Sequence, residues 1–360
     1  MTDPLKRLQE FGQSFWYDNI HRGLITAGGL QRLIDEDGLR GVTSNPTIFE
    51  KAIAGSADYQ DAIQVLVREG LDAKALFEAL SIEDIQSAAD LLRPVYDGTQ
   101  GADGLVSLEL PPALAHDTEG SVAEAHRLFR KVDRPNVMIK VPGTREGIPA
   151  VERLISDGIN INITLLFSLA RYEEVMEVYI RGLERRVQED RPVDGVASVA
   201  SFFVSRVDTA VDRALDALLK TTRNAGERAR LEGLKGKAAI ANAKLAYQRF
   251  KATFNDKRFK ALEAAGARVQ RPLWASTSTK NPAYRDVLYV EELIGPNTIN
   301  TMPTQTIEAF RDHGRLRPSL EEDVEGARRT LKELAEVGVD MHAVTEKLQV
   351  DGVKAFGESY

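Results

Sequence analysis

Residues 121–141, with the sequence SVAEAHRLFRKVDRPNVMIKV, contain the unit that decides the fold. Apolar residues recur at helical spacing over residues 121–131, and residues 136–141 then form a short β-rich run. Helical stretches such as residues 170–189 and 207–221 separate further runs of this kind. The other β-rich runs are residues 14–18, 39–45, 104–110, 159–166, 196–203, 272–278 and 298–302. Eight strands that alternate with helices predict an α/β protein with a closed (β/α)8 TIM barrel.

Additional helical regions flank or interrupt this repeat. A segment rich in Ala, Lys and Arg, residues 222–266, lies between the sixth and seventh runs, and no Pro-, Gly- or Ser-rich linker brackets it. Residues 319–360 also have helical character, which Gly338 and Gly352 are expected to interrupt. With a helix at the N-terminus, the sequence predicts a single barrel domain over residues 1–360 that includes the helical insertion.

The composition excludes several classes of function. Of the 360 residues, 43% are hydrophobic and 28% are charged, as in ordinary globular proteins. The net charge of −7 argues against nucleic-acid binding, so any anionic ligand must be held by local positive charge. The absence of cysteine excludes disulfides and thiolate sites. Neither a secretory signal nor an apolar run long enough to cross a bilayer is visible, so a cytoplasmic protein without membrane contact is expected.

Alternate side chains of a barrel strand point into the barrel, and the others pack beneath the surrounding helices. In residues 136–141 this alternation directs Val137, Ile139 and Val141 outward and Met138 and Lys140 inward. The same alternation places mostly polar residues on the inner side of the other runs. These inner residues are Asp18, Thr43, Asn45, Ser107, Glu109, Asn162, Thr164, Ser201, Phe203, Trp274, Ser276 and Ser278. The pattern predicts a polar site at the carboxyl ends of the strands, where active sites of this fold lie.

Lys140 has two interpretations. Most lysines near strands reach solvent or pair with a carboxylate, and Glu109 and Asp18 are predicted at the same rim. Burial of an unpaired ammonium costs free energy, so an inward lysine is expected to be neutral or paired. A desolvated lysine is a nucleophile toward carbonyl carbons, and carboxylates beside it can perform the acid and base steps. From these residues alone, both the ion pair and the nucleophile remain open.

Other motifs are poor candidates for a functional site. The five histidines show no close metal-ligand spacing, so no metal site is expected. Residues 233–237, GLKGK, lack the spacing of a phosphate-binding loop, and no G-x-G-x-x-G follows a strand. Nucleotide and nicotinamide chemistry are therefore not indicated.

Three segments, taken in order, resemble the signatures of the transaldolase family. They are residues 41–47, GVTSNPT, residues 137–144, VMIKVPGT, and residues 162–168, NITLLFS. The resemblance extends from Phe15 to the neighbourhood of Phe310. It is greatest to the longer bacterial form, which has an extra helical segment after the sixth strand.

The resemblance implies catalytic roles for four residues. Lys140 matches the lysine that forms a Schiff base, and Asp18 matches the acid/base aspartate. Glu109 and Thr164 match the pair that holds a catalytic water. No cofactor is implied.

The resemblance also implies substrate-binding residues, which are Thr43, Asn45, Asn162, Ser201, Phe203, Arg206, Ser278 and Lys280. Asn45 and Asn162 match asparagines that orient a bound three-carbon unit, and Arg206 matches a phosphate ligand. Lys280 stands where many members have a second phosphate-binding arginine. A lysine keeps the charge but lacks the planar fork that binds an anion through two nitrogens.

The implied reaction transfers a dihydroxyacetone unit from sedoheptulose 7-phosphate or fructose 6-phosphate to glyceraldehyde 3-phosphate or erythrose 4-phosphate. It belongs to the non-oxidative pentose phosphate pathway, and its partners are sugar phosphates, with a homodimer as a further expectation. One alternative is a related aldolase that releases free dihydroxyacetone, but that relative has a tyrosine in place of the arrangement around Glu109. The other alternative is a sugar-phosphate-binding barrel without activity. Residues 356–360 are expected to fray rather than to close over the site.

Overall fold

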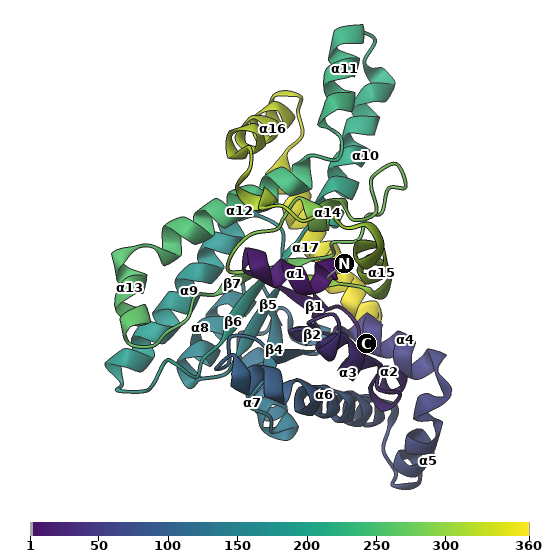
Figure 1. Ribbon diagram of the computed structural model, residues 1–360, viewed down its shortest axis with the longest axis vertical. Coiled ribbons are helices and arrows are strands. Elements are labelled where there is room, and N and C mark those ends of the chain that lie inside the picture. Colours follow the sequence, from purple (N-terminus) through teal and green to yellow (C-terminus); the bar gives the residue numbers. More distant parts are fainter. Residues whose placement is uncertain (1–2, 360) are drawn as a thin grey trace.

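The computed structural model describes residues 3–359, and they form the predicted closed barrel (Figure 1). The strands follow one another around the barrel in sequence order, and β1 pairs in parallel with β8 to close it. The strands are β1 (Gln13–Tyr17), β2 (Gly41–Thr43), β3 (Leu105–Glu109), β4 (Val137–Pro142), β5 (Ile161–Leu166), β6 (Ser198–Phe203), β7 (Arg271–Ala275) and β8 (Thr298–Met302).

Helices connect the strands and surround them, as Figure 1 shows. The α-helices are α1 (Pro4–Arg7), α2 (Arg22–Thr26), α3 (Gly29–Asp35), α4 (Pro46–Gly55), α5 (Gln60–Arg68), α6 (Ala73–Gly98), α7 (Thr118–Val132), α8 (Gly147–Asp157), α9 (Leu169–Gln188), α10 (Ser205–Thr221), α11 (Ala225–Leu234), α12 (Ala238–Phe254), α13 (Lys257–Ala264), α14 (Leu288–Glu291), α15 (Thr304–His313), α16 (Val324–Glu336) and α17 (Met341–Glu358). Short 3-10 helices are η1 (Leu8–Phe11), η2 (Ala57–Tyr59), η3 (Pro112–Leu114) and η4 (Ser319–Glu321). None of the helices among residues 3–359 is long and apolar enough to span a membrane.

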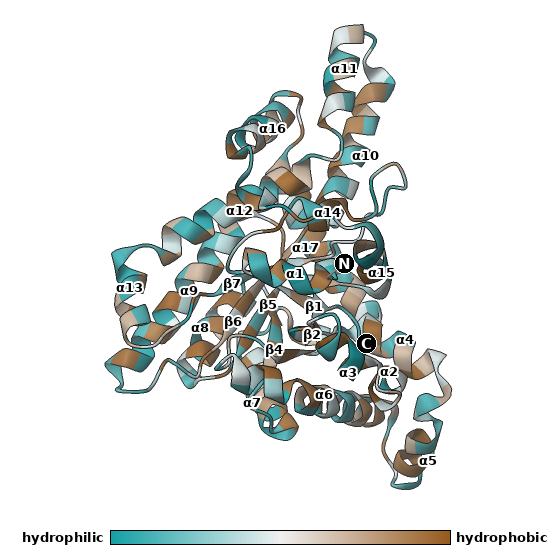
Figure 2. Cartoon of the chain, viewed as in Figure 1, coloured by the Kyte–Doolittle hydropathy of each residue, from teal (hydrophilic) through white to brown (hydrophobic). Residues whose placement is uncertain are grey.

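The outer helices are amphipathic, and hydrophobic and hydrophilic residues alternate along them (Figure 2). In α9 the buried residues Tyr172, Val175, Tyr179 and Leu183 recur every three or four positions and so face one side. Burial of each such side chain contributes about 1.5–3 kcal/mol to folding. The side chain of Ser168 caps the start of this helix by accepting a hydrogen bond from the backbone N–H of Arg171.

The predicted insertion, residues 222–266, consists of α11, α12 and α13, which follow α10 between β6 and β7. Asp208 and Asp212 of α10 hold the start of α12. Their carboxylates accept hydrogen bonds from the backbone N–H groups of Ala239 and Gly236, at 2.7 and 3.0 Å. Buried helix α12 in turn packs against α9, α10 and α16, so the insertion is fastened to the outer ring of the barrel.

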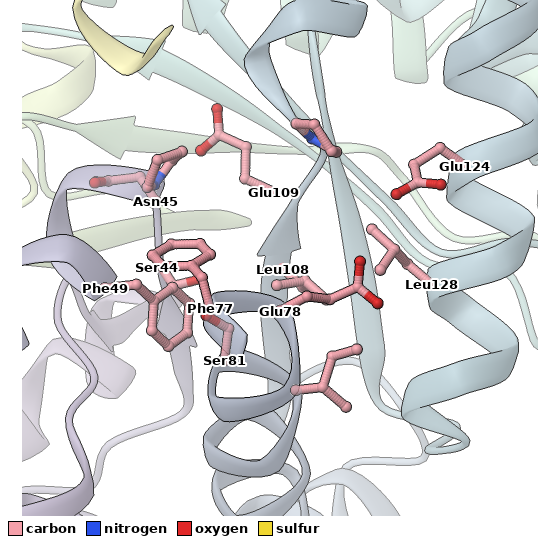
Figure 3. Close-up of a pocket in the computed structure, with 13 residues that line it drawn as sticks. Ser44, Asn45, Phe49, Phe77, Glu78, Ser81, Leu108, Glu109, Glu124 and Leu128 are labelled. Carbon is pink, nitrogen blue, oxygen red and sulfur yellow. The ribbon is translucent and has the colours of Figure 1, made fainter. Parts of the chain in front are cut away.

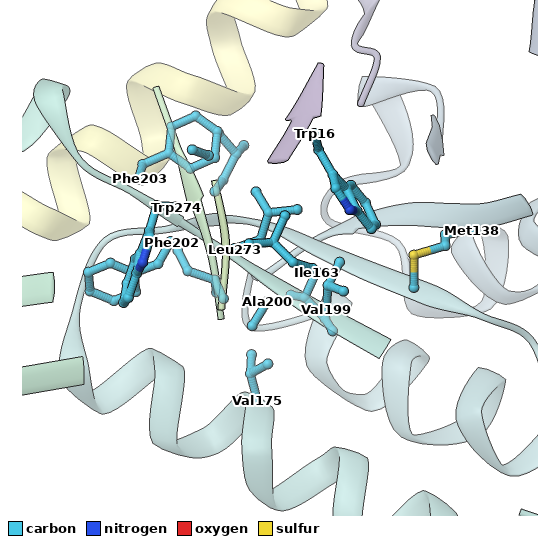
Figure 4. Close-up of a cluster of buried hydrophobic side chains, with 14 of the residues drawn as sticks. Trp16, Met138, Ile163, Val175, Val199, Ala200, Phe202, Phe203, Leu273 and Trp274 are labelled. Carbon is cyan, nitrogen blue, oxygen red and sulfur yellow. The ribbon is translucent and has the colours of Figure 1, made fainter. Parts of the chain in front are cut away.

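The predicted alternation holds for β3, β4 and β5. Glu109 on β3, Lys140 on β4 and Asn162 on β5 are partners in register, so their side chains share the inner face. Trp16 of β1 also points inward (Figure 4). A Cβ atom added to Gly41 would lie only 2.4 Å from the indole ring of Trp16. The glycine thus leaves space for the indole that fills the barrel below the polar site.

One prediction about strand β7 is wrong. Trp274 was expected to face inward, but it pairs in register with Phe202, and the two rings pack edge to face with centroids 6.2 Å apart (Figure 4). Phe202 itself packs against Tyr172 of α9, so both side chains lie between the sheet and the helices. The strand ends at Ala275 because Ser276 has a positive φ of 56°, which breaks the alternation.

Two predictions about the C-terminal region are also wrong. Gly338 separates α16 from α17 as expected, whereas Gly352 lies inside α17. A Cβ there would lie 2.8 Å from a methyl group of Leu165, so glycine allows the helix to approach the barrel closely. Residues 356–358 complete α17 and do not fray, because buried Phe356 packs into the barrel mouth. Tyr360 lies outside the described residues.

Candidate active site

A cavity of about 240 Å³, which we call the barrel-mouth cavity, lies at the carboxyl ends of the strands. Its lining residues are Asp18, Thr43, Asn45, Lys140, Thr164, Ser201, Phe203, Arg206, Ala275, Ser276, Ser278, Lys280, Thr301, Pro303, Gln305 and Phe356. Every predicted site residue lines it except Glu109 and Asn162. These two contact residues of the lining, Lys140 and Ser201 respectively.

Lys140 is buried at the centre of this arrangement, with its side chain only 5% exposed. Its Nζ donates a hydrogen bond to the carbonyl oxygen of Ser44 at 3.0 Å and lies 3.0 Å from Oε2 of Glu109. A buried ammonium needs partners of this kind. The lysine is therefore inward-facing and held in place, with its amine at the wall of the cavity.

Asp18 follows β1 directly and lines the same cavity. Its Oδ1 accepts a hydrogen bond of 2.8 Å from the hydroxyl of Thr43, which also lies 2.6 Å from the hydroxyl of Thr301. Burial raises the pKa of Asp18, and the charge of Lys140 and the Thr43 hydrogen bond oppose this rise. A carboxyl group shifted toward neutral pH suits acid/base work.

Glu109 stands behind Lys140, at the end of β3. Burial raises the pKa of its carboxyl group, and the Lys140 ammonium opposes the rise. Oε2 pairs with that ammonium by charge but accepts no well-directed hydrogen bond from residues 3–359. Glu109 lines a second, smaller cavity of about 30 Å³, which we call the side cavity (Figure 3).

A short hydrogen-bond chain fixes Asn162. The hydroxyl of Ser201 donates to its Oδ1 at 2.7 Å, and its Nδ2 donates to the hydroxyl of Ser107 at 3.0 Å. The hydroxyl of Thr164, on the same strand, is buried and has no hydrogen-bond partner among residues 3–359. It is free to bond a water or ligand in the cavity.

Asn45 lines the cavity and also caps helix α4. Its Oδ1 accepts a hydrogen bond of 3.0 Å from the backbone N–H of Ile48 and so caps α4, whose first residue is Pro46. The side-chain NH2 group is left as the donor toward a ligand. The dipeptide Asn-Pro thus explains both the start of the helix and the orientation of the amide.

The far side of the cavity is cationic. Arg206 and Lys280 line it, and burial lowers the pKa of both side chains, with Arg206 lowering that of Lys280 further. The Arg206 guanidinium lies 5.2 Å above the centre of the Phe203 ring, and Lys280 Nζ donates to the Ser278 hydroxyl at 2.5 Å. Two adjacent cations would be mutually repulsive, so the arrangement favours an anion between them.

Helix α17 closes part of the cavity mouth, which the sequence did not predict. Phe356 lines the cavity, and the side-chain amide of Gln349 donates to the carbonyl oxygens of Gly143 and Leu165, at 2.8 and 3.2 Å. Thr301 was also missed, although it follows the inward phase of β8 and could have been found by the same alternation. Nothing local in the sequence indicates Phe356, because its contact spans the length of the chain.

No group of three or more His, Asp or Glu residues between Asp3 and Ser359 is close enough to hold a metal ion. His116, His126 and His313 instead pair with carboxylates outside the barrel, at 3.1, 2.8 and 2.8 Å. They lie apart from the polar lining of the barrel-mouth cavity.

Comparison with known proteins agrees with this geometry. The family described as transaldolase/fructose-6-phosphate aldolase matches residues 15–360. A transaldolase of Thiobacillus denitrificans is 50% identical over 355 residues, which cover 99% of this chain and 97% of that protein. A transaldolase of Trichodesmium erythraeum and transaldolase 2 of Nostoc punctiforme are each 47% identical over 358 residues, covering 99% of this chain and 94% of theirs. Since these matches span both partners almost completely, the chain belongs to the transaldolase family and is an enzyme of that type.

Proposed function

We propose that this enzyme transfers a dihydroxyacetone unit between sugar phosphates through a Schiff base on Lys140. The observation that carries the proposal is the buried Lys140 on the wall of a polar cavity, with the Glu109 carboxylate 3.0 Å away and the Asp18 carboxylate lining the same cavity. The donors are fructose 6-phosphate and sedoheptulose 7-phosphate, and the acceptors are erythrose 4-phosphate and glyceraldehyde 3-phosphate.

In the first half-reaction the neutral amine of Lys140 adds to the C2 ketone of the donor. Glu109 gives a proton to the resulting C2 hydroxyl, water leaves, and a protonated imine forms. Asp18 then takes the proton of the C4 hydroxyl while the bond between C3 and C4 breaks. The electrons of that bond pass into the iminium, so an enamine remains on the lysine and the aldose phosphate departs.

In the second half-reaction the enamine carbon attacks the aldehyde of the acceptor, and Asp18 returns its proton to the new hydroxyl. Water then adds to the imine, Glu109 accepts a proton from it, and the ketose product leaves Lys140. The unbonded hydroxyl of Thr164 supports its assignment, with Glu109, to the water used in these steps. Asn45, Asn162, Ser201 and Thr43 orient the hydroxyl groups of the three-carbon unit.

Arg206 and Lys280 bind the phosphate at the far end of the substrate, with Ser278 and Phe203 beside them. Binding energy from this remote group holds C2 against Lys140 and C4 against Asp18. Partial desolvation lowers the pKa of both side chains, and the charge of Arg206 lowers that of Lys280 further, so an anion bound beside them would be favoured by both charges.

Loss of the Lys280 cation is expected to weaken phosphate binding. Lys280→Ala should raise the KM for fructose 6-phosphate about 10-fold to 100-fold, since one charge-assisted hydrogen bond contributes about 1.5–3 kcal/mol. Lys280→Arg introduces a planar guanidinium group that can bind the phosphate through two nitrogens. It should keep KM at or below the wild-type value. Steady-state kinetics check this prediction, and unchanged KM in Lys280→Ala would remove Lys280 from the phosphate site.

The main competing function is release of free dihydroxyacetone to water. The family profile includes fructose-6-phosphate aldolases, so the alternative is chemically close. Glu109, paired with Lys140, favours transfer, because the aldolase relative carries a tyrosine in place of this arrangement.

An acceptor-dependence assay separates the two functions. Fructose 6-phosphate is supplied with and without erythrose 4-phosphate, and glyceraldehyde 3-phosphate is followed by a coupled enzyme. Multiple turnovers that require the acceptor support transfer. Equal turnover without the acceptor would identify an aldolase instead.

Three further parts of the proposal rest on the resemblance to the family and on the sequence. We place the enzyme in the cytoplasm, as a homodimer, with residues 1–360 forming one barrel domain. Gel filtration with light scattering tests the dimer, and a single cooperative unfolding transition tests the domain.

A further inference from the structure

The strands on either side of β1 each place a threonine hydroxyl on the inner face of the barrel. Thr43 belongs to β2 and Thr301 to β8, and each residue is only 2% exposed. Their hydroxyl oxygens lie 2.6 Å apart, and both residues line the barrel-mouth cavity. Asp18 directly follows β1, and its Oδ1 lies 2.8 Å from the same Thr43 oxygen. The two hydroxyls and the carboxyl group therefore form one hydrogen-bonded chain.

The chemistry of the three groups fixes the direction of this chain. A hydroxyl has one proton to donate, and an ionised carboxylate can only accept. While Asp18 is ionised, the Thr43 proton is directed to the carboxylate, so the hydrogen bond between the threonines uses the proton of Thr301. Between residues 3 and 359 the Thr301 hydroxyl has no other hydrogen-bond partner. Thr301 thus donates to Thr43, and Thr43 donates to Asp18.

The backbone of β8 fixes the position of Thr301. Thr301 pairs in register with Trp16, and Met302 pairs with Tyr17. The backbone N–H of Asp18 then donates to the carbonyl oxygen of Met302 at 2.9 Å. The β-branched side chain of threonine also has restricted rotation about χ1. Strand β8 therefore holds Asp18 twice, at the backbone through Met302 and at the side chain through the threonine chain.

The proposed Schiff-base reaction, on which this inference rests, needs the Asp18 carboxyl group in one orientation. Asp18 takes the proton of the C4 hydroxyl when the C3–C4 bond breaks and returns it when the new bond forms. A misplacement of about 1 Å in such a group can cost about 10²-fold in rate. The Thr301 donor keeps the Thr43 hydroxyl from turning away from the carboxylate, and successive hydrogen bonds strengthen one another. Loss of the Thr301 hydroxyl would therefore loosen Asp18.

We propose that Thr301 is a positioning residue for the carbon–carbon step, because its hydroxyl holds the Thr43 hydroxyl in the orientation that donates to Asp18. Imine formation and hydrolysis use Lys140 and Glu109, which pair with each other and not with Thr301. These two steps are therefore independent of Thr301. Its effect is confined to cleavage and formation of the C3–C4 bond.

The test measures the carbon–carbon step by itself. Enzyme is loaded with the three-carbon enamine from fructose 6-phosphate while a coupled enzyme removes glyceraldehyde 3-phosphate. It is then mixed with erythrose 4-phosphate, and acid quenching counts product whether bound or free. Thr301→Val keeps the shape of the side chain but loses one hydrogen bond, and should slow this rate about threefold to tenfold. Thr301→Ser keeps the hydroxyl and should retain most of the wild-type rate.

A second readout isolates the imine steps. Enzyme-dependent loss of ¹⁸O from C2-labelled fructose 6-phosphate requires imine formation and hydrolysis only, and it should match the wild type in both Thr301 variants. Thr298→Val is the matched control, since Thr298 lies at the other end of β8 and its hydroxyl bonds to Gln13 and to the carbonyl oxygen of Gly295. It should leave both rates unchanged. Thermal unfolding establishes that each variant is folded, and Thr301→Ala replaces Thr301→Val if the valine variant does not fold.

A double-mutant cycle tests whether Thr301 acts through Thr43. Thr43→Val alone should slow the carbon–carbon step at least as much as Thr301→Val does. Adding Thr301→Val to Thr43→Val should then lower the rate by less than about twofold, because the two residues belong to one chain. A further loss equal to the full effect of Thr301→Val would show that Thr301 acts independently of Thr43, and would overturn the inference.

Three other results would also overturn the inference. They are an unchanged carbon–carbon rate in Thr301→Val, an equal slowing of the carbon–carbon and imine steps, and a Thr301→Ser variant as slow as Thr301→Val. The failure of the proposed function is distinct from these results. In that case the wild type itself would catalyse no ¹⁸O loss and would form no adduct with borohydride.

Discussion

Replacing Lys140 by methionine is expected to reduce turnover of fructose 6-phosphate and erythrose 4-phosphate by about 10⁴-fold or more, since loss of a covalent nucleophile has effects of this size. Methionine is chosen because it fills the space of the lysine stem without leaving a large void. The coupled assay for glyceraldehyde 3-phosphate measures the loss.

The control for this substitution is Lys260→Ala, which removes an exposed lysine that pairs with Glu263 three residues later. It should retain wild-type turnover. A folded Lys140→Met protein with comparable turnover to the wild type would contradict the role of Lys140. Circular dichroism and thermal unfolding establish that the variant is folded.

Replacing Asp18 by asparagine is expected to lower turnover about 10²–10⁴-fold, the usual effect of losing a general acid/base. The imine with Lys140 should still form, because Asp18 acts only on the C4 hydroxyl. Borohydride should therefore trap a fructose 6-phosphate adduct in Asp18→Asn. Absence of that adduct would instead assign Asp18 to imine formation.

The pH dependence of turnover gives a related expectation for Asp18. The aspartate must be ionised to accept the C4 proton, and burial raises its pKa above the ordinary aspartate value. Activity should consequently fall as the pH decreases through this raised pKa, at a higher pH than for an exposed aspartate.

The raised pKa of Asp18 also affects the free energy of unfolding. A carboxyl group with a raised pKa in the folded state contributes stability below its unfolded pKa, and this contribution is lost as the pH rises through the folded pKa. Above its folded pKa the ionised Asp18 therefore reduces stability, and at such a pH Asp18→Asn should unfold at a higher urea concentration than the wild type. A lower urea midpoint would show that Asp18 stabilises the fold by its contacts.

Local pattern predicted the inner face of the barrel well because the period of a strand fixes the side to which each residue points. Residues 136–141 alone placed Lys140 inside, and the same phase in residues 104–110 placed Glu109 beside it, as their register now shows. The insertion was visible because its length exceeds that of an ordinary connection between strands. These features depend on residues close together in the chain.

The errors arise where the backbone leaves the regular strand or where distant segments meet. Ser276 and Leu165 both have positive φ values. The alternation of β7 ends at Ser276, and the register between β5 and β6 shifts near Leu165. Neither serine nor leucine is a residue type that predicts a positive φ. Phe356 reaches the site only because α17 crosses the barrel mouth. The side cavity needs α6 and α7 to pack beside β3, which no local pattern predicts.

The central claim is a covalent intermediate on Lys140, and borohydride reduction in the presence of fructose 6-phosphate tests it most directly. The reduced protein is digested and its modified peptide is sequenced by mass spectrometry. We predict a stable adduct on the peptide that contains Lys140 in the wild type, and none in Lys140→Met. An adduct on another lysine, or no adduct while the wild type turns over, would contradict the account.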